Sequence, residues 1–204
     1  MLLLDRDFLK PTKKLRALAI MESLALDNML SQHRLSELSG MSNAMVNQYL
    51  KTLKDEALIA FEPINGKSFS YCLTGEGETV RRTYFETYCS EIVRSYSALK
   101  SMILNKLQML EEKGRTGLVL FGASETCEVV LSAIKDTPFR IVAIVDNDPQ
   151  KHGRTIHGHV IQPPVVLDNL ACHAVVITSF GRQDEIHKQL VTIYPGKEME
   201  IVRL

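Results

Sequence analysis

The stretch SQHRLSELSGMSNAMVNQYLKTLKDEALI, residues 31–59, decides the fold of the N-terminal part. Ser31 and Ser42 each precede a segment of periodic apolar residues, and serine at that place caps a helix. Gly40 follows the first segment, where the left-handed residue that ends a helix is expected. The stretch therefore predicts two short helices joined by a tight turn, which is the layout of a DNA-binding helix-turn-helix.

Apolar residues mark the buried side of each predicted helix. A preceding helix is expected over residues 12–27, with Thr12 as its cap. In the helix after Ser42, apolar residues recur at spacings of four and three, which makes a buried stripe. The residues expected inside are Leu15, Leu18, Ala19, Leu24 and Leu26 of the first helix, Leu35 and Leu38 of the second, Met41 in the turn, and Val46, Leu50 and Leu53 of the third.

The opposite face of the third helix is polar, so its side chains can reach base edges and phosphates. Beyond it, Asn65-Gly66 separates two strand-like runs, residues 58–61 and 68–73, and this is a strong hairpin signal. Three helices followed by a hairpin make a winged helix. The candidate DNA-binding residues are Ser42, Asn43, Asn47, Gln48, Lys51 and Thr52 of the third helix, with Asn65 and Lys67 at the wing tip.

The run LSQHRLSELSGMSNAMVNQYLKTLKDEALI, followed by the hairpin and LTGEGE, resembles the winged helix of MarR-type transcription regulators. The resemblance implies that the third helix enters the major groove and that the wing touches the minor groove or the backbone. Gln48 departs from the family pattern, because Arg is common there, and Ala57 stands where a helix-ending Gly is usual. Winged helices also serve as protein–protein modules, and that alternative stays open.

The composition of the chain indicates how it could bind DNA and in which cellular compartment it is expected. The 204-residue chain is 45% hydrophobic with a formal net charge of zero, and residues 1–75 hold nine Lys and Arg against eight Asp and Glu. Contact with DNA must therefore come from local placement of charge. Four cysteines without a CxxC pair fit reduced thiols. No apolar run approaches a membrane span, and Asp5 interrupts the leading leucines. We expect a cytoplasmic protein.

A long helix is predicted between the winged helix and the C-terminal part. Thr74 can cap it, and Lys113-Gly114 is the next good stop signal. One unbroken helix would be about 57 Å long. Apolar and aromatic residues recur along it at steps of three or four, and an apolar stripe this long needs a partner, most simply the same helix of a second chain. We therefore expect a homodimer. A break near Ser95 or Ser97, giving a helical hairpin, is the alternative. The stripe comprises Val80, Tyr84, Tyr88, Ile92, Tyr96, Leu99, Ile103, Leu107 and Leu110.

The C-terminal part alternates strands and helices. Strands are expected at residues 117–121, 140–145, 174–178 and 198–203, with helices from the turn at Gly122 to about Lys135 and over residues 182–193. This alternation predicts parallel βαβ units. The expected organisation is thus an α+β winged helix-turn-helix at residues 1–75, a helical spacer at 76–114, and a small α/β Rossmann-like parallel-sheet domain at 115–204.

The turn after the first of these strands is a degraded GxGxxG. Gly122 holds the first place, while Ser124 and Cys127 replace the other two glycines. The backbone N–H groups of such a turn point at an anion near the helix N-terminus. Asp146 follows Gly122 by 24 residues and ends the next strand, which suits an acceptor for a ribose hydroxyl.

The segment FGASETCEVVLSAIKDTPFRIVAIVDNDPQKHGRTIHGHVI resembles the nucleotide-binding part of polysaccharide-pathway sugar-modifying proteins and is similar to the Rossmann domain of the redox-sensing repressor Rex. The resemblance implies NAD(H) or a nucleotide sugar as the ligand, bound by Gly122, Ala123, Ser124, Asp146, Asn147, Thr178 and Ser179, with Asp148 and Phe180 beside them.

Other chemistry is not favoured. His152, His157 and His159 have no Cys or carboxylate at ligand spacing, so no metal site is expected. Tyr96 and Lys100 form a YxxxK pair, but it lies in the spacer helix, and GxSxG, HExxH and Walker lysine motifs are absent from the sequence.

We predict a ligand-responsive DNA-binding regulator and no enzyme. Two alternatives remain: an accessory protein of nucleotide-sugar metabolism whose winged helix contacts protein, and a regulator whose Rossmann-like domain serves only oligomerisation.

Overall fold

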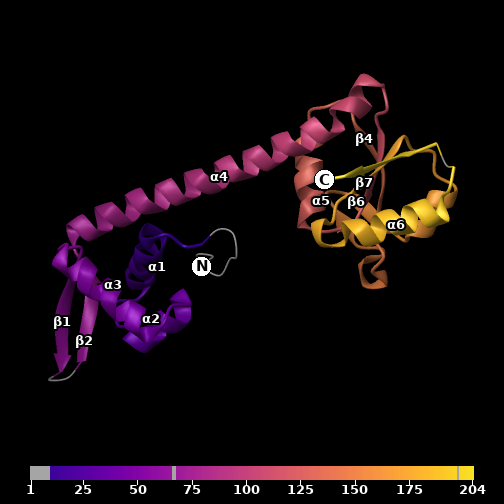
Figure 1. Ribbon diagram of the computed structural model, residues 1–204. Helices are drawn as coiled ribbons and strands as arrows, with labels where there is room; N and C mark the ends of the chain where they lie inside the picture. The colour runs from indigo at the N-terminus through magenta and orange to yellow at the C-terminus, as the bar shows by residue number, and fades with distance from the viewer. Residues whose placement is uncertain (1–9, 66–67, 197) are drawn as a thin grey trace. The chain divides into compact units, whose positions relative to one another are not determined.

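The computed structural model describes residues 10–65, 68–196 and 198–204, and it divides the chain into two compact units, Met1–Arg94 and Ser95–Leu204 (Figure 1). Each unit has its own buried core. Among the described residues, no helix is long and apolar enough to cross a membrane. All four cysteines are free thiols.

The first unit begins with the predicted helices, α1 (Lys13–Leu26), α2 (Gln32–Ser39) and α3 (Asn43–Asp55). Each starts at the expected cap. The side-chain oxygens of Thr12, Ser31 and Ser42 accept the N–H three residues on, at 3.1, 3.2 and 3.3 Å. Gly40 ends α2 with a φ of 64°, so the turn chemistry deduced from the sequence is confirmed.

The core of this unit corrects two burial predictions. Leu26 is 88% exposed and Leu38 is 43% exposed. Leu26 follows the buried Leu24 by two residues, which turns it to the far side of α1. The inward face of α2 instead contains Leu35 and Ser39, four residues apart. The buried cluster is Ile20, Met21, Leu24, Leu35, Met41, Val46, Leu50, Leu53, Leu58, Ile59 and Tyr71.

The wing is an antiparallel hairpin of β1 (Ile59–Asn65) and β2 (Ser68–Leu73), which Figure 1 shows as two arrows below α3. Phe61 packs edge-on against Tyr71 with ring centroids 4.9 Å apart, and the Lys54 ammonium of α3 lies 4.4 Å from the Phe61 centroid. These contacts fix the hairpin to the end of α3. Gly66, Lys67 and the side chain of Asn65 lie outside the described residues.

The end of α3 forms a Schellman motif without its usual glycine. The N–H of Leu58 donates to the Leu53 carbonyl at 2.8 Å, and the N–H of Ala57 donates to the Lys54 carbonyl at 2.9 Å. Ala57 occupies the left-handed position with a φ of 56°. Ala57 therefore retains the Schellman geometry and places a Cβ where it costs conformational energy.

Helix α4 (Gly75–Glu112) is one continuous helix of 38 residues that passes through Ser95 and Ser97 without a break. Its start is attached to the first unit. Thr74 caps it by accepting the Gly77 N–H at 2.9 Å, and a Cβ on Gly77 would lie 1.8 Å from the Leu58 carbonyl oxygen, so only glycine fits there. Arg81 forms ion pairs with Glu22 of α1 and with Glu78.

The apolar stripe of α4 is partly covered by the chain itself. Val80 packs against the core of the first unit, and Ile103, Leu107 and Leu110 are buried in the core of the second. The expectation that a partner chain covers the whole stripe is therefore wrong at both ends. The sequence could not reveal this for the last turns of α4, because the sheet that covers them is formed by later residues and its packing on α4 is not encoded in the local apolar spacing.

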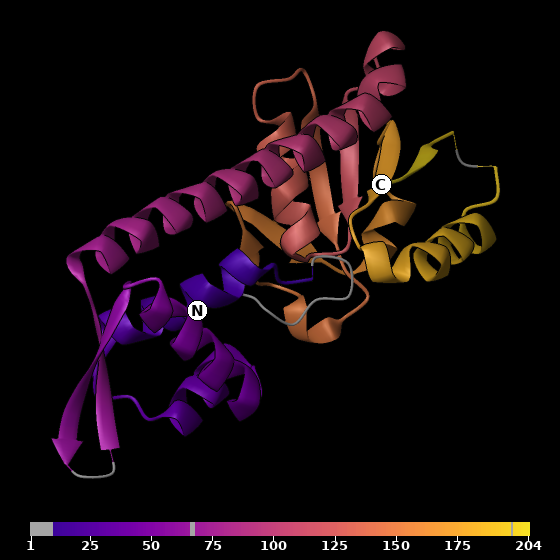
Figure 2. The same ribbon diagram turned by 60° about the vertical axis from the view of Figure 1, so that its left-hand side comes forward.

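The second unit contains a six-stranded sheet in the order β5-β6-β4-β3-β7-β8, in which only β5 runs antiparallel to its neighbour (Figures 1 and 2). The short β5–β6 hairpin was not predicted, so the sheet is mixed. The order of the five parallel strands reverses after β3, which places β3 between β4 and β7. The strands are β3 (Gly117–Phe121), β4 (Arg140–Val145), β5 (Thr155–Ile156), β6 (His159–Gln162), β7 (Ala174–Ile177) and β8 (Glu200–Arg203).

Helices cover both faces of this sheet. The last turns of α4 and α5 (Glu125–Ile134) pack with Leu118 and Leu120 on one face. On the other, α6 (Gln183–Ile193) packs with Val119 and Phe121. Alternate β3 side chains thus enter opposite cores, as in a central strand. Three short 3₁₀ turns complete the unit: η1 (Pro149–Lys151), η2 (Pro164–Asp168) and η3 (Phe180–Arg182).

Candidate functional site

The predicted DNA-reading face of α3 is fully accessible. Val46, Leu50 and Leu53 are buried on one side of the helix, and all six candidate residues are exposed on the other. Ser42 caps the helix, and the Thr52 hydroxyl donates to the Gln48 carbonyl at 3.0 Å. No hydrogen bond joins the remaining four side chains to another described residue: Asn43, Asn47, Gln48 and Lys51.

The charge near this face is modest. On α2, Arg34 donates to Glu37 at 2.7 Å, and this hydrogen bond lowers the pKa of the Glu37 carboxyl. Lys54 is held over the Phe61 ring, and Asp55 and Glu56 are exposed at the end of α3. Lys51 is therefore the side chain on the face with a positive charge available to a phosphate.

The predicted nucleotide site lies at the carboxyl edge of the sheet, where β3 ends. Gly122 has a φ of 113°, and a Cβ there would approach the Ser179 Cβ to 3.1 Å. The Thr178 hydroxyl donates to the Gly122 carbonyl at 2.6 Å, and the Ser124 hydroxyl donates to the Thr178 carbonyl at 2.8 Å. The turn and the segment after β7 are thus directly hydrogen-bonded to each other.

Asp146 is buried, and its carboxylate is already surrounded by donors. Oδ1 accepts the Asp148 N–H at 2.8 Å. Oδ2 accepts the Ala123 N–H at 2.7 Å and the Lys151 ammonium at 2.9 Å. Burial alone raises the pKa of the Asp146 carboxyl, but the hydrogen bonds from Asp148, Lys151 and Ala123 outweigh it and hold the pKa below its usual value.

Lys151 is the residue of this edge that sequence reasoning missed. Its ammonium also donates to the Ala123 carbonyl at 2.9 Å, so it bridges the turn and the end of β4. The His152 ring hydrogen-bonds the Asp146 carbonyl at 2.8 Å. A signal was present in the sequence, because a basic residue five positions after Asp146 and just past Pro149 can fold back over a 3₁₀ turn.

The other predicted ligand residues differ in their surroundings. Asn147 turns to α6 and exchanges side-chain hydrogen bonds with Gln189 at 2.7 and 3.1 Å. Ser179 lies beside Gly122. Glu125 and Glu128 place negative charge in the first turn of α5, which opposes a phosphate at that helix end.

Cys127 lies next to the Gly122 turn, at the third place of the degraded GxGxxG. Burial raises the pKa of the Cys127 thiol to about 12, so this cysteine is unreactive at neutral pH. Within the described part of the chain, no group of three His, Cys, Asp or Glu side chains is placed to hold a metal ion.

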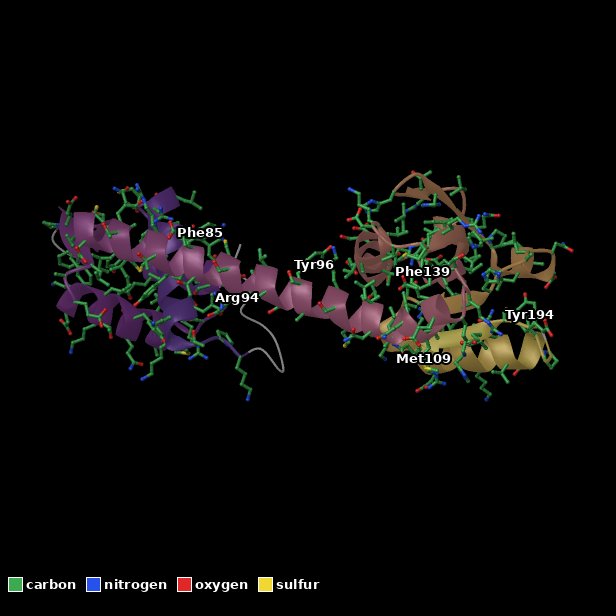
Figure 3. The ribbon with its side chains drawn as sticks, turned by 90° about the horizontal axis from the view of Figure 1, so that it is seen from above. Phe85, Arg94, Tyr96, Met109, Phe139 and Tyr194 are labelled. Carbon is green, nitrogen blue, oxygen red and sulfur yellow. The ribbon has the colours of Figure 1, made fainter. Side chains whose placement is uncertain are left out.

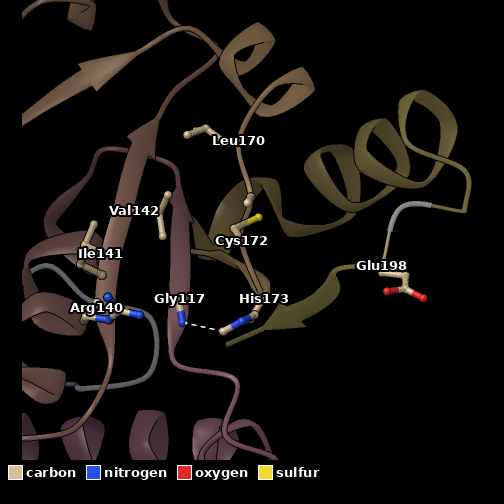
Figure 4. Close-up of a pocket in the computed structure, with 9 residues that line it drawn as sticks. Gly117, Arg140, Ile141, Val142, Leu170, Cys172, His173 and Glu198 are labelled. Carbon is tan, nitrogen blue, oxygen red and sulfur yellow. Dashed lines mark hydrogen bonds between the residues drawn. The ribbon is translucent and has the colours of Figure 1, made fainter.

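A separate hollow of about 700 Å³ opens at the amino edge of the same sheet (Figure 4). It does not coincide with the Gly122 turn, because Gly117 lies at the other end of β3. The lining residues are Gly117, Arg140, Ile141, Val142, Leu170, Ala171, Cys172, His173 and Glu198.

Comparisons with known proteins match parts of the chain. Residues 115–201 match the family model described as C2185-like, N-terminal. A search among curated proteins finds no match. Solved structures that resemble parts of the chain include MarR-family regulators and a dehydrogenase.

RV1404 from Mycobacterium tuberculosis is 21% identical with a TM-score of 0.34, over 41% of this chain and 58% of that one, so the chain spans little more than half of it. The MarR family protein RV2887 of the same organism, solved with salicylic acid, is 18% identical with a TM-score of 0.37, over 48% and 74%. UDP-D-quinovosamine 4-dehydrogenase from Vibrio fischeri is 19% identical with a TM-score of 0.37, over 44% and 78%.

Proposed function

We propose that this protein is a DNA-binding transcription regulator that reads DNA with α3 and the wing. The observation that supports this best is the accessible polar face of α3 on a winged helix. Asn47 and Gln48 are exposed, and such amides pair in bidentate fashion with adenine edges in the major groove. Lys51 supplies a phosphate contact on the same face. The near-neutral charge means that specificity rests on base contacts more than on a general electrostatic field.

The test is selection of a DNA site from random duplexes, followed by measurement of affinity for the double variant Asn47→Ala, Gln48→Ala. Loss of each bidentate contact should cost roughly 1–3 kcal/mol of discrimination. The matched control is Gln150→Ala, Asn169→Ala, which removes two exposed amides from the second unit and should bind as wild type does. Unchanged affinity of the α3 double variant, with its fold intact by circular dichroism, would refute base reading by α3.

We also propose that the regulator is a homodimer whose contact includes the middle of α4. The side chains there that neither core covers are Phe85, Ile92, Val93 and Tyr96, between 41% and 62% exposed. Figure 3 labels Phe85 and Tyr96 on this part of α4. Phe85, Ile92 and Tyr96 follow one another at steps of seven and four, which places them along one stripe. Two winged helices would then read the two half-sites of a two-fold operator.

The second unit is proposed to sense NAD(H) or a nucleotide sugar at the carboxyl edge around Gly122. Support comes from the strand order, which reverses beside β3, since ligands of open α/β sheets bind at such a point. Gly122, Ala123, Ser124, Asp146 and Thr178 also converge there. A ligand that uses the Ala123 N–H must first displace the Asp146 carboxylate, so binding requires rearrangement of the turn.

A specific observation favours the alternative, a unit that serves only as a scaffold. The polar groups of the turn are satisfied internally by Asp146, Thr178 and Lys151. Calorimetry with NAD(H), NADP(H), and UDP- and GDP-sugars separates the two. If a compound binds and its affinity changes in Lys151→Met but not in the exposed control Lys188→Met, sensing at this turn is supported. Absence of binding at millimolar concentration by any of these compounds supports the scaffold and leaves the DNA-binding proposal untouched.

A further inference from the structure

Gly117 lines the hollow at the amino edge of the sheet and has no side chain to fill it. A Cβ on Gly117 would lie 3.4 Å from the Val142 Cγ2 and 3.5 Å from the His173 Nδ1, so these two side chains flank the bare backbone of Gly117. Its volume of about 700 Å³ falls within the range of small-molecule pockets, roughly 300–1,000 Å³.

A β-bulge shapes one wall of the hollow. Leu118 pairs with Ile141 and Val119 pairs with Ala143, so Val142 is an extra residue in β4. Val142 is 36% exposed and lines the hollow, as does Leu170, so both offer apolar surface to it (Figure 4). Bulges are common where a strand re-aims a side chain toward a functional site.

Two donors stand on either side of Gly117. The Gly117 N–H donates to the His173 Nδ1 at 3.0 Å, so the neutral imidazole holds its proton on Nε2 and can donate it. Arg140 is exposed, and no acidic side chain of the described residues pairs with its guanidinium. Figure 4 shows Arg140 and His173 flanking Gly117 from β4 and from the segment before β7.

We propose that this hollow binds a small molecule with one anionic group, a carboxylate, on an apolar body. The carboxylate would accept from Arg140 and His173, a charge-assisted arrangement that suits the planar guanidinium. The apolar body would lie against Val142 and Leu170. Glu198 lines the far side and repels further negative charge, so the hollow is unsuited to nucleotides and other polyanions. This site is independent of the Gly122 turn and of DNA binding.

The experiment titrates the full-length ¹⁵N-labelled protein with three six-carbon probes that have similar linear alkyl chains: hexanoate, hexanol and hexylammonium. Hexanoate should give saturable shifts of the Gly117, Val142 and His173 amide resonances, and it should bind at least roughly tenfold more tightly than hexanol, which corresponds to one charge-assisted contact. Hexylammonium should bind most weakly, because Arg140 repels it.

Variants test the placement. Arg140→Gln should weaken hexanoate roughly tenfold and leave hexanol within about twofold, because it removes the charge and keeps most of the stem. Ala171→Phe, at an exposed lining position, should block both probes by filling the hollow. Arg154→Gln removes an exposed cation from the β5 side and is the matched control.

Three outcomes overturn the proposal: no saturable shifts with hexanoate up to roughly 50 mM, equal affinity for hexanoate and hexanol, or unchanged hexanoate binding by Arg140→Gln. Because the amide spectrum reports the folded state of every variant, loss of binding through unfolding is recognised directly.

Discussion

The backbone N–H of Ala123 donates to the Asp146 carboxylate at 2.7 Å, and this bond fastens the turn after β3 to the end of β4. In a dinucleotide site the amides of such a turn approach a phosphate. Here the protein's own carboxylate occupies one of these amides and is itself neutralised by Lys151. The turn therefore has an internal anion, and any external ligand must compete with it.

Replacing Asp146 by Asn should destabilise the second unit by roughly 1.5–3 kcal/mol at neutral pH, because hydrogen bonds to a charged group are lost. Since the folded pKa of Asp146 is lowered, its ionised form stabilises the fold above the unfolded value of about 3.9, and this contribution disappears as the pH falls through the folded pKa. Urea unfolding, followed by resonances of the second unit, measures the free energy of unfolding. The difference in this free energy between wild type and Asp146→Asn should narrow below about pH 4.

The exposed Asp136→Asn is the control for this measurement and should follow wild type throughout. If the difference in free energy of unfolding between wild type and Asp146→Asn is the same at neutral and acid pH, the charge of Asp146 does not stabilise the fold.

Ala57→Gly should stabilise the first unit by about 1 kcal/mol, because Ala57 holds a φ of 56° and glycine adopts that region without a Cβ clash. Denaturant unfolding of the first unit provides the measurement. Ala44→Gly, at an exposed position in the first turn of the same helix, is the control and should lower stability by up to about 1 kcal/mol. Destabilisation by Ala57→Gly would contradict the strain assigned to this position.

Lys51→Gln should weaken DNA binding similarly across sequences and reduce the slope of log affinity against log salt by about 1, the effect of one lost phosphate contact. The measurement is fluorescence anisotropy over a salt series. Lys188→Gln, exposed on α6, should leave the slope as it is in wild type. If the slope for Lys51→Gln equals that of wild type, Lys51 does not contact a phosphate.

The proposed dimer should dissociate in Ile92→Lys, because a charge would be placed in an apolar contact without a partner. Ile92 suits this test since it is 48% exposed, whereas Leu99 packs against the core of the second unit and its replacement would damage the fold. Light scattering at micromolar concentration measures the change, with Ile193→Lys on α6, 55% exposed in wild type, as control. A monomeric wild type at that concentration would disprove the dimer.

The sequence by itself determined the local structure of both units. Ser31 and Ser42 cap their helices, Gly40 ends α2, and the strand-like runs on either side of the wing tip form an antiparallel hairpin. The bounds of β4 were also predictable from its continuous apolar run. These features are decided within about four residues, because capping bonds and turn conformations depend on near neighbours.

The tertiary structure alone decided what covers each face and which polar groups are satisfied. Leu38 faces solvent although its apolar spacing pointed inward, and Leu107 of α4 is buried by a sheet that follows it in the chain. Lys151 neutralises Asp146, and Gly117 meets His173 from 56 residues away. Such pairings depend on strand order and on the packing of distant segments, and neither is contained in the local pattern of residues from which caps and turns are predicted.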